Sequence, residues 1–229
     1  MLFDLRSRGR RRTVQGVYLG LALLMGGGLV LFGVGAGNGF GGLLNAFNGN
    51  GSGSNQGQVV SSYEKSALKA VKANPASASA WASLMQARWT AATSNGAGFN
   101  QSTGSFTAAG NNELRQLGQD WQRYLQLTKT PTADNAILAA KAYGILGQYG
   151  NAADAWDDVS LASPSDVSAY ECLAATAYAA RQTRKGDLAT AKSLSLLPKA
   201  NQATIKLQLG QAKSSSSTAQ QIVRSSCAV

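Results

Sequence analysis

Apolar and polar residues are distributed along this chain in three distinct patterns. Residues 16–34 (GVYLGLALLMGGGLVLFGV) carry no charged side chain, and their length is close to the roughly 20 residues that a helix needs to cross a bilayer. Between residues 59 and 213, apolar residues recur every three or four positions, which predicts amphipathic helices. Small polar residues dominate the rest of the chain after residue 34.

These patterns predict an all-α protein with five segments. They are a basic N-terminus (1–15), a transmembrane helix (16–36), a linker (37–58), a helical domain (59–213) and a Ser-rich C-terminal tail (214–229). The linker is rich in Gly, Asn and Ser, so it is expected to be a flexible tether that cannot bury enough apolar surface to fold. The tail has a similar composition and is also expected to be loose.

Four prolines divide the helical domain: Pro75, Pro131, Pro164 and Pro198. The last three are separated by 33 and 34 residues, which matches a 34-residue helix-pair repeat, whereas the first two are 56 residues apart. A proline cannot continue the helix before it, and Thr132 or Ser165 can cap the helix that follows. The run Ile205, Leu207, Leu209 alternates like a strand, but its neighbours favour a terminal helix.

An insertion explains the longer first interval. Residues 93–112 (TSNGAGFNQSTGSFTAAGNN) are rich in Gly, Ser, Thr and Asn, which predicts a loop between the two helices of the first unit. The second helix of that unit is marked by Leu114, Leu117, Trp121 and Tyr124, and the first by Trp81 and Leu84.

Within these units the residues resemble the tetratricopeptide repeat. The best match covers residues 133–166, with Tyr143 on the first helix and Tyr149, Ala152 and Trp156 on the second. The second helix of the next unit (GDLATAKSLSLLP) fits only when it is shifted by two residues. The resemblance implies an α-solenoid of about three degenerate tetratricopeptide-like helix pairs, flanked by a leading and a capping helix. Together with the apolar run, the chain resembles membrane-anchored tetratricopeptide proteins of the bacterial envelope.

Charge sets the expected orientation of the anchor. The chain has 21 basic and 11 acidic residues, a formal net charge of +10. Five arginines precede the apolar run: Arg6, Arg8, Arg10, Arg11 and Arg12. Because basic residues mark the cytoplasmic end of a membrane helix, the N-terminus is expected in the cytoplasm and the helical domain outside it, as a single-pass protein of the cell membrane. The orientation of the membrane helix is a sufficient reason for these arginines, so no nucleic-acid partner is expected.

A cleaved signal peptide is the competing interpretation of the same segment. It shares the order of basic and apolar residues, and small residues follow the apolar run at 35–37. Its apolar core would be about 7 to 15 residues long, which favours a retained anchor here. The pair Arg11-Arg12 fits a twin-arginine signal only loosely.

Two pairs of glycines in the apolar segment are four residues apart: Gly16 with Gly20, and Gly33 with Gly37. This spacing lets two membrane helices approach closely and would allow weak self-association. Because glycine is common in membrane helices, a packing-neutral role is the alternative.

The chain contains no histidine, which removes the commonest general base and metal ligand. Its two cysteines, Cys172 and Cys227, are too few and too far apart for a zinc site, so neither a metal nor a cofactor is expected. The cysteines either form a disulfide outside the cytosol, or remain as a buried Cys172 and a free Cys227 in the tail.

Tetratricopeptide domains bind peptides or protein surfaces in a groove lined by the first helix of each repeat, and the resemblance implies the same activity here. The repeat register places five residues toward this groove: Gln86, Trp89, Lys141, Glu171 and Tyr178. The residues with which some cytosolic members clamp a carboxylate terminus are not reproduced. The leading hypothesis is therefore a non-catalytic scaffold or chaperone-like module that binds another envelope protein or a newly exported chain.

An envelope enzyme, or a subunit of one, is the alternative hypothesis. Its site would use the hydroxyls of the inserted loop: Ser102, Thr103, Ser105 and Thr107. The loop contains no Asp, Glu, Lys or Arg that could act as a base, so catalysis is not expected.

Overall fold

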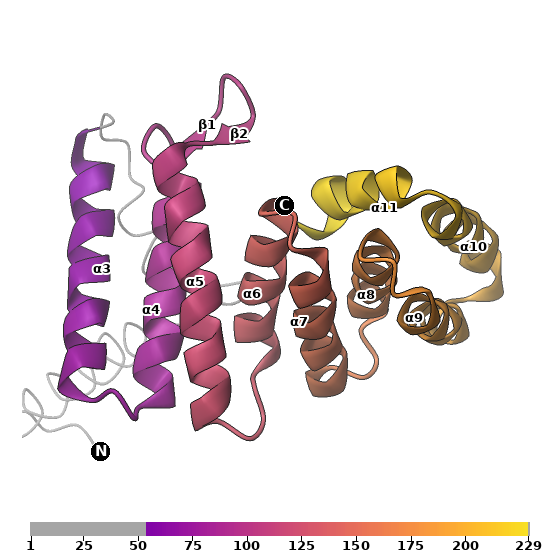
Figure 1. Ribbon diagram of the computed structural model, residues 1–229, viewed down its shortest axis with the longest axis horizontal. Helices are drawn as coiled ribbons and strands as arrows, with labels where there is room; N and C mark the ends of the chain where they lie inside the picture. Colours follow the sequence, from indigo (N-terminus) through magenta and orange to yellow (C-terminus); the bar gives the residue numbers. More distant parts are fainter. Residues whose placement is uncertain (1–53, 229) are drawn as a thin grey trace, which may run out of the picture. The chain divides into compact units, whose positions relative to one another are not determined.

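The computed structural model describes residues 54–228, and this part of the chain is almost entirely helical (Figure 1). Its nine α-helices are α3 (Ser54–Ala73), α4 (Ala78–Thr93), α5 (Ala108–Leu127), α6 (Ala133–Ile145), α7 (Tyr149–Ala162), α8 (Val167–Ala179), α9 (Thr183–Leu196), α10 (Lys199–Ser214) and α11 (Ser216–Ile222). A π-helical turn, η1 (Val223–Cys227), and two short strands, β1 (Phe99–Asn100) and β2 (Ser105–Phe106), complete the structure of this part.

The predicted basic N-terminus, transmembrane helix and most of the linker lie outside the described residues. Helix α3 begins at Ser54, inside the segment predicted to be linker. Among residues 54–228, no helix combines the length and the apolar character needed to cross a membrane.

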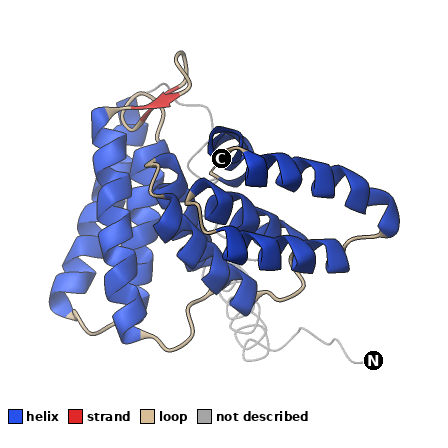
Figure 2. Ribbon diagram, turned by 45° about the vertical axis from the view of Figure 1, so that its right-hand side comes forward, coloured by secondary structure: helices blue, strands red, loops and turns tan. Residues whose placement is uncertain are grey.

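The helices pack in sequential pairs, α4 with α5, α6 with α7, and α8 with α9, and each pair packs on the next (Figures 1 and 2). Helix α3 packs on α4 ahead of the first pair, and α10 and α11 follow the last. The four prolines lie in the connections between these units. The predicted all-α architecture of helix pairs with flanking helices is therefore confirmed.

The second and third pairs repeat with a regular period. Helices α8 and α9 begin and end 34 residues after α6 and α7. The predicted two-residue shift of α9 is therefore wrong. Gly186 takes the place of Ala152, because a Cβ at position 186 would collide with the ring of Tyr178.

The turns inside these two pairs have the same backbone geometry. Gly147 and Arg181 occupy equivalent positions with positive φ angles of 72° and 61°. The amide after each donates to a carbonyl five residues earlier, Gln148 to Tyr143 and Gln182 to Ala177, both at 2.8 Å. A left-handed residue is a common way to end a helix, and here it turns the chain tightly into the next one.

The first residues of α6 and α8 differ from the sequence prediction in the side chains that cap them. Thr132 occupies the cap position of α6 but makes no capping bond through its side chain. Helix α8 is capped by Asp166, whose carboxylate accepts from the amides of Ser168 and Ala169, and not by the predicted Ser165. A carboxylate is favoured there because it is an ionised acceptor at the positive end of the helix.

The predicted loop 93–112 is shorter than expected, because α5 begins at Ala108. Thr107 sets this start, since its hydroxyl accepts from the amide of Gly110 at 3.0 Å and donates to the carbonyl of Ala97 at 2.7 Å. Within the loop, β1 and β2 form an antiparallel hairpin.

The C-terminal segment, residues 215–228, is not a loose tail. Ser215 caps α11 by accepting from the amide of Thr218 at 3.3 Å. Ala219, Val223 and Cys227 are spaced four residues apart and are all buried. Among the many serines of this segment, these three residues form a short apolar stripe. The stripe is the surface through which the segment packs on the rest of the domain.

A buried arginine connects the first three helices. Arg88 of α4 is 6% exposed, and its Nε lies 2.6 Å from a carboxylate oxygen of Asp120 on α5. Its Nη1 lies 3.0 Å from Glu113 of α5 and 3.3 Å from Glu64 of α3. Because neighbouring helical residues point about 100° apart, fixing Arg88 on this side directs Trp89 to another face of α4.

We expect Arg88→Met to lower the free energy of unfolding by about 3–5 kcal/mol, because it leaves three carboxylates around a buried position without their cation. Chemical denaturation of the protein measures this. Arg115→Met removes an exposed arginine of α5 and is the matched control. Equal effects of the two substitutions would contradict a structural role for Arg88.

The same cluster predicts a dependence of stability on pH. Burial raises the pKa of Glu64 and of Asp120 above their ordinary values of 4.5 and 3.8, although Arg88 opposes the shift. The stability that comes from protonating these groups is therefore present below their ordinary pKa values, and it is lost as the pH rises through the raised values.

We expect Glu64→Gln to reduce this loss, so that the free energy of unfolding falls less between acidic and neutral pH than in the unchanged protein. Urea denaturation at a series of pH values measures the difference. Asp134→Asn, at an exposed position on α6, is the control and should leave the slope nearly unchanged. An unaltered slope in Glu64→Gln would show that the pKa of Glu64 does not contribute.

Candidate functional site

The five residues predicted to line a groove occupy different environments. Gln86 and Trp89 lie half-buried on α4, and Lys141 lies half-buried on α6, where burial lowers its pKa. Of the five, only Trp89 lines the large apolar cavity described below.

The two groove candidates on α8 are differently placed. Tyr178 is 5% exposed, and its hydroxyl donates to the carboxylate of Asp187 on α9 at 2.9 Å, so it faces the partner helix of its own pair and not a groove. Burial, with Asp187 beside the hydroxyl, raises the pKa of Tyr178 to about 12. Glu171 is half-buried, and burial raises its pKa.

The C-terminal segment covers part of the face formed by the first helices of the pairs. Helix α11 packs on α8, and η1 packs on both α6 and α8 (Figures 1 and 2). Val223 and Ala228 are buried in this contact. The face where a tetratricopeptide groove was expected is thus occupied along α6 and α8 by the chain itself.

Gly144 of α6 makes this close approach possible. A Cβ at this position would lie 3.2 Å from a methyl carbon of Val223 and 3.4 Å from the Cβ of Ala228. The absence of a side chain at Gly144 therefore gives the C-terminal segment room to lie against α6.

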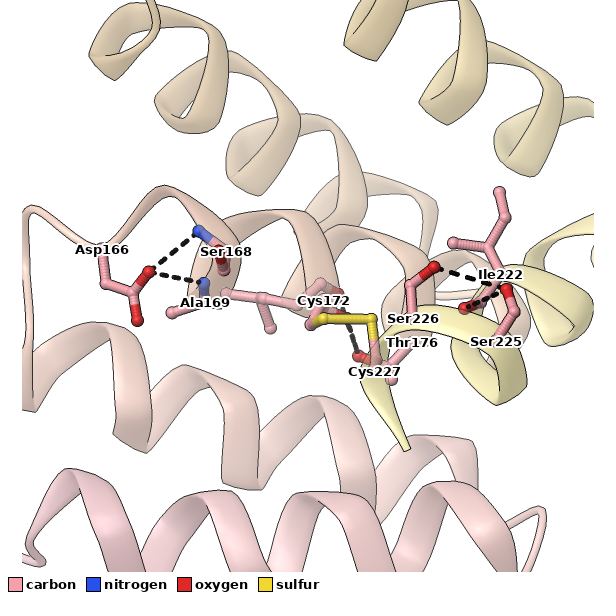
Figure 3. The surroundings of a disulfide bond; sticks show 10 residues. Asp166, Ser168, Ala169, Cys172, Thr176, Ile222, Ser225, Ser226 and Cys227 are labelled. Atoms are coloured by element: carbon pink, nitrogen blue, oxygen red, sulfur yellow. Dashed lines mark hydrogen bonds between the residues drawn. A yellow bond between two sulfur atoms is a disulfide. The ribbon is translucent and has the colours of Figure 1, made fainter. Parts of the chain in front are cut away.

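A disulfide between Cys172 of α8 and Cys227 of η1 fixes the segment covalently (Figure 3). The two cysteines are 55 residues apart in the chain, and Cys227 is 3% exposed. Of the two alternatives that the sequence left open, the free Cys227 is therefore wrong. The disulfide indicates an oxidising, extracytoplasmic location.

Beyond the covered part, the face continues into an apolar cavity of about 440 Å³. Its lining comes from the end of α4, the hairpin, the end of α6 and the C-terminal segment: Trp89, Thr93, Phe99, Gly104, Phe106, Ile145, Arg224 and Ala228. Polar side-chain atoms in this lining belong only to Thr93, Arg224 and the indole of Trp89. The cavity is suited to a large apolar group.

The aromatic wall of the cavity is held by the hairpin. Phe99 and Phe106 are paired across the two strands, and their rings meet edge to face with centroids 5.1 Å apart. At the base of the hairpin, neither Gly98 nor Gly110 has room for a Cβ, which would collide with the carbonyls of Ala91 and Ala92 at position 98 and with the carbonyl of Gly98 at position 110. The loop is therefore an ordered part of the site.

Arg224 stands at the edge of the cavity with its side chain exposed. No acidic side chain within residues 54–228 forms an ion pair with it. Arg224 also borders a polar depression lined by Ser217, Gln220, Gln221 and Ser225. One guanidinium therefore stands between an apolar cavity and a surface of hydroxyls and amides.

Three of the four hydroxyls considered for an enzyme site, those of Thr103, Ser105 and Thr107, are used in the structure of the loop itself. Those of Thr103 and Ser105 lie 2.6 Å apart, and Thr107 caps α5. The side-chain oxygen of Asn100 accepts from the amide of Ser102 at 2.9 Å. Nothing in this arrangement favours the enzyme hypothesis. Among the described residues, no three His, Cys, Asp or Glu side chains are grouped so that they could hold a metal.

Sequence reasoning missed the residues that close the cavity. Phe99 and Phe106 are aromatic residues in an otherwise polar loop. Their presence there could have indicated that the loop forms one wall of an apolar cavity. The four-residue spacing of Ala219, Val223 and Cys227 could have indicated a docked helix.

Comparison with known protein families finds no match for this chain, and comparison with curated proteins finds none either.

We expect Cys227→Ser to lower the free energy of unfolding by about 4 kcal/mol, because it removes the cross-link between positions 55 residues apart. Amide hydrogen exchange in residues 216–228 should accelerate more than in α6 and α7. Ser225→Ala, which changes an exposed neighbour, is the control. Unchanged exchange in Cys227→Ser would show that packing alone holds the segment.

Proposed function

We propose that this protein is a membrane-tethered, non-catalytic interaction module whose tetratricopeptide-like domain binds a protein partner outside the cytoplasm. The observation that carries this proposal is the apolar cavity of about 440 Å³ beside Trp89. Exposed apolar concavities are uncommon on the surface of a monomeric domain unless something binds there.

The helical repeat supports the same function. The 34-residue period of α6–α9 and the resemblance of residues 133–166 favour a tetratricopeptide-like unit, a class that binds peptides on the face of its first helices. On this chain the C-terminal segment fills that face along α6 and α8. The open part lies at α4, where the cavity is.

The tether supports the location. The apolar run at 16–36, with arginines before it, is suited to a single membrane helix that leaves the following domain outside the cytoplasm. The disulfide Cys172–Cys227 is consistent with that side of the membrane. A scaffold or chaperone-like role for other envelope proteins follows from this placement.

Site-specific photocrosslinking in intact cells tests the proposal. Benzoylphenylalanine replaces Phe99 at the cavity or Leu161, which is 74% exposed on α7 and away from the cavity lining. We expect a discrete protein adduct from position 99, present in the membrane fraction and absent from position 161.

Adducts of equal intensity at both positions, or no protein adduct at either, would contradict an interaction module that uses this face. Fractionation of the same cells reports the size of the mature chain. Recovery of a shortened, soluble form would contradict the retained tether.

A further inference from the structure

We infer that the apolar cavity and Arg224 form one bipartite site for a peptide segment that carries a large apolar side chain next to an acidic one. The inference rests on the proposed function, and it names the chemistry that the partner presents. The apolar side chain enters the cavity, and the carboxylate lies against the guanidinium at its edge.

The size and lining of the cavity determine the first half of the site. Its volume of about 440 Å³ lies within the range of about 300–1,000 Å³ that is usual for ligand pockets. Phe99, Phe106 and Ile145 offer carbon surface and no hydrogen-bond partner. A polar side chain would lose its hydration there without compensation, whereas a leucine or aromatic side chain gains free energy from burial.

Charge determines the second half. Within the described part of the chain, exposed Arg224 has no acidic partner, whereas Arg88 and Lys185 each have carboxylates within ion-pair distance. The inserted loop carries no charge of either sign. An acidic group beside the cavity would therefore be attracted to Arg224 without competition from an Asp or Glu of the described residues, and a lysine there would be repelled.

The polar depression favours a peptide over a lipid. It borders Arg224 and is lined by Ser217, Gln220, Gln221 and Ser225. The hydroxyls of Ser217 and Ser225 already bond to Ser215 and to the carbonyl of Ile222, and each keeps a lone pair that can accept a further hydrogen bond. Such groups suit the amides and carbonyls of a peptide backbone that continues past the acidic residue. An acyl chain would fill the cavity but leave this surface unused.

Two walls of the site lie outside the helix pairs. These two walls come from the inserted hairpin and from the C-terminal segment, and Arg224 is three residues from the cross-linked Cys227. The disulfide therefore holds the backbone that carries Arg224 beside the aromatic wall. A preorganised pair of subsites loses less entropy when a ligand binds.

Binding of short, end-blocked fluorescent peptides to the full chain, oxidised and held in phosphatidylcholine vesicles, tests the inference. The peptides share a central leucine or phenylalanine and differ only in its neighbour, which is Glu, Gln or Lys. We expect the Glu peptide to bind most tightly and the Lys peptide to bind at least about tenfold more weakly by fluorescence anisotropy, which corresponds to about 1.4 kcal/mol.

Two variants separate the subsites. Arg224→Glu should weaken the Glu peptide by about tenfold and restore binding of the Lys peptide, whereas Arg115→Glu on α5 is the charge-reversal control and should change neither. Thr93→Trp, which places a large side chain into the cavity from its exposed edge, should abolish binding of all the peptides.

Equal affinity for the Glu and Lys peptides, or no exchange of preference in Arg224→Glu, would overturn the inference. Complete displacement of the Glu peptide by laurate, with no dependence on Arg224, would overturn it in favour of a lipid site. If the protein adduct at position 99 persists while these peptides fail, the proposed function stands and only the assigned chemistry is wrong. If neither the adduct at position 99 nor binding of the peptides is observed, the proposed function and this inference are both wrong.

Discussion

The cross-linked packing of the C-terminal segment on α6 and α8 is the constraint on which the face of the domain depends. A helical repeat leaves the first helices of its pairs exposed along one side, and here η1 and α11 cover two of them. Three features make this contact specific: the glycine at position 144, the buried stripe ending at Cys227, and the disulfide to Cys172. What remains open is therefore a bounded cavity instead of a continuous groove. The last residues of the described chain thus decide the shape of a site whose opposite wall comes from residues 99–106.

The opposite end of the domain is held by charge instead of a covalent bond. Arg88 lies between three carboxylates from two neighbouring helices, and it fixes α3 and α5 against α4. Ionising all three acids leaves an excess of negative charge in a buried place, which is why burial raises the pKa of Asp120 and Glu64 even with the guanidinium beside them. The cluster specifies the position of α4 at an energetic cost that varies with pH. Because Trp89 is the next residue, the same cluster also orients the helix whose other side faces the cavity.

Local features of the sequence account for most of the fold. The proline spacing indicates where helix pairs begin, and the amphipathic spacing of Leu114, Leu117, Trp121 and Tyr124 indicates the buried side of α5. The errors arose where local composition and tertiary packing disagree. The Ser-rich composition of residues 214–229 suggested a loose tail, but the buried positions among residues 215–228 are set by contact with α6 and α8, which no local pattern contains. The groove residues were taken from a repeat register that has no place for an inserted hairpin or for a docked C-terminal segment. Of the residues that line the cavity, this register therefore includes Trp89 but not Phe99, Phe106 or Arg224.

The two arginines Arg88 and Arg224 show that the surroundings of a side chain decide whether it stabilises the fold or is available to bind a ligand. Arg88 is buried and meets more carboxylates than it can neutralise, so its charge is fully used within the domain. Arg224 is exposed at the edge of an apolar cavity, and no acid in the described part of the chain pairs with it. An exposed arginine in water has little need of a partner, and alone it would indicate nothing. Beside a concave apolar surface the same charge can select among ligands, because a bound apolar group holds its neighbour close to the guanidinium, where water is partly excluded and the attraction is stronger.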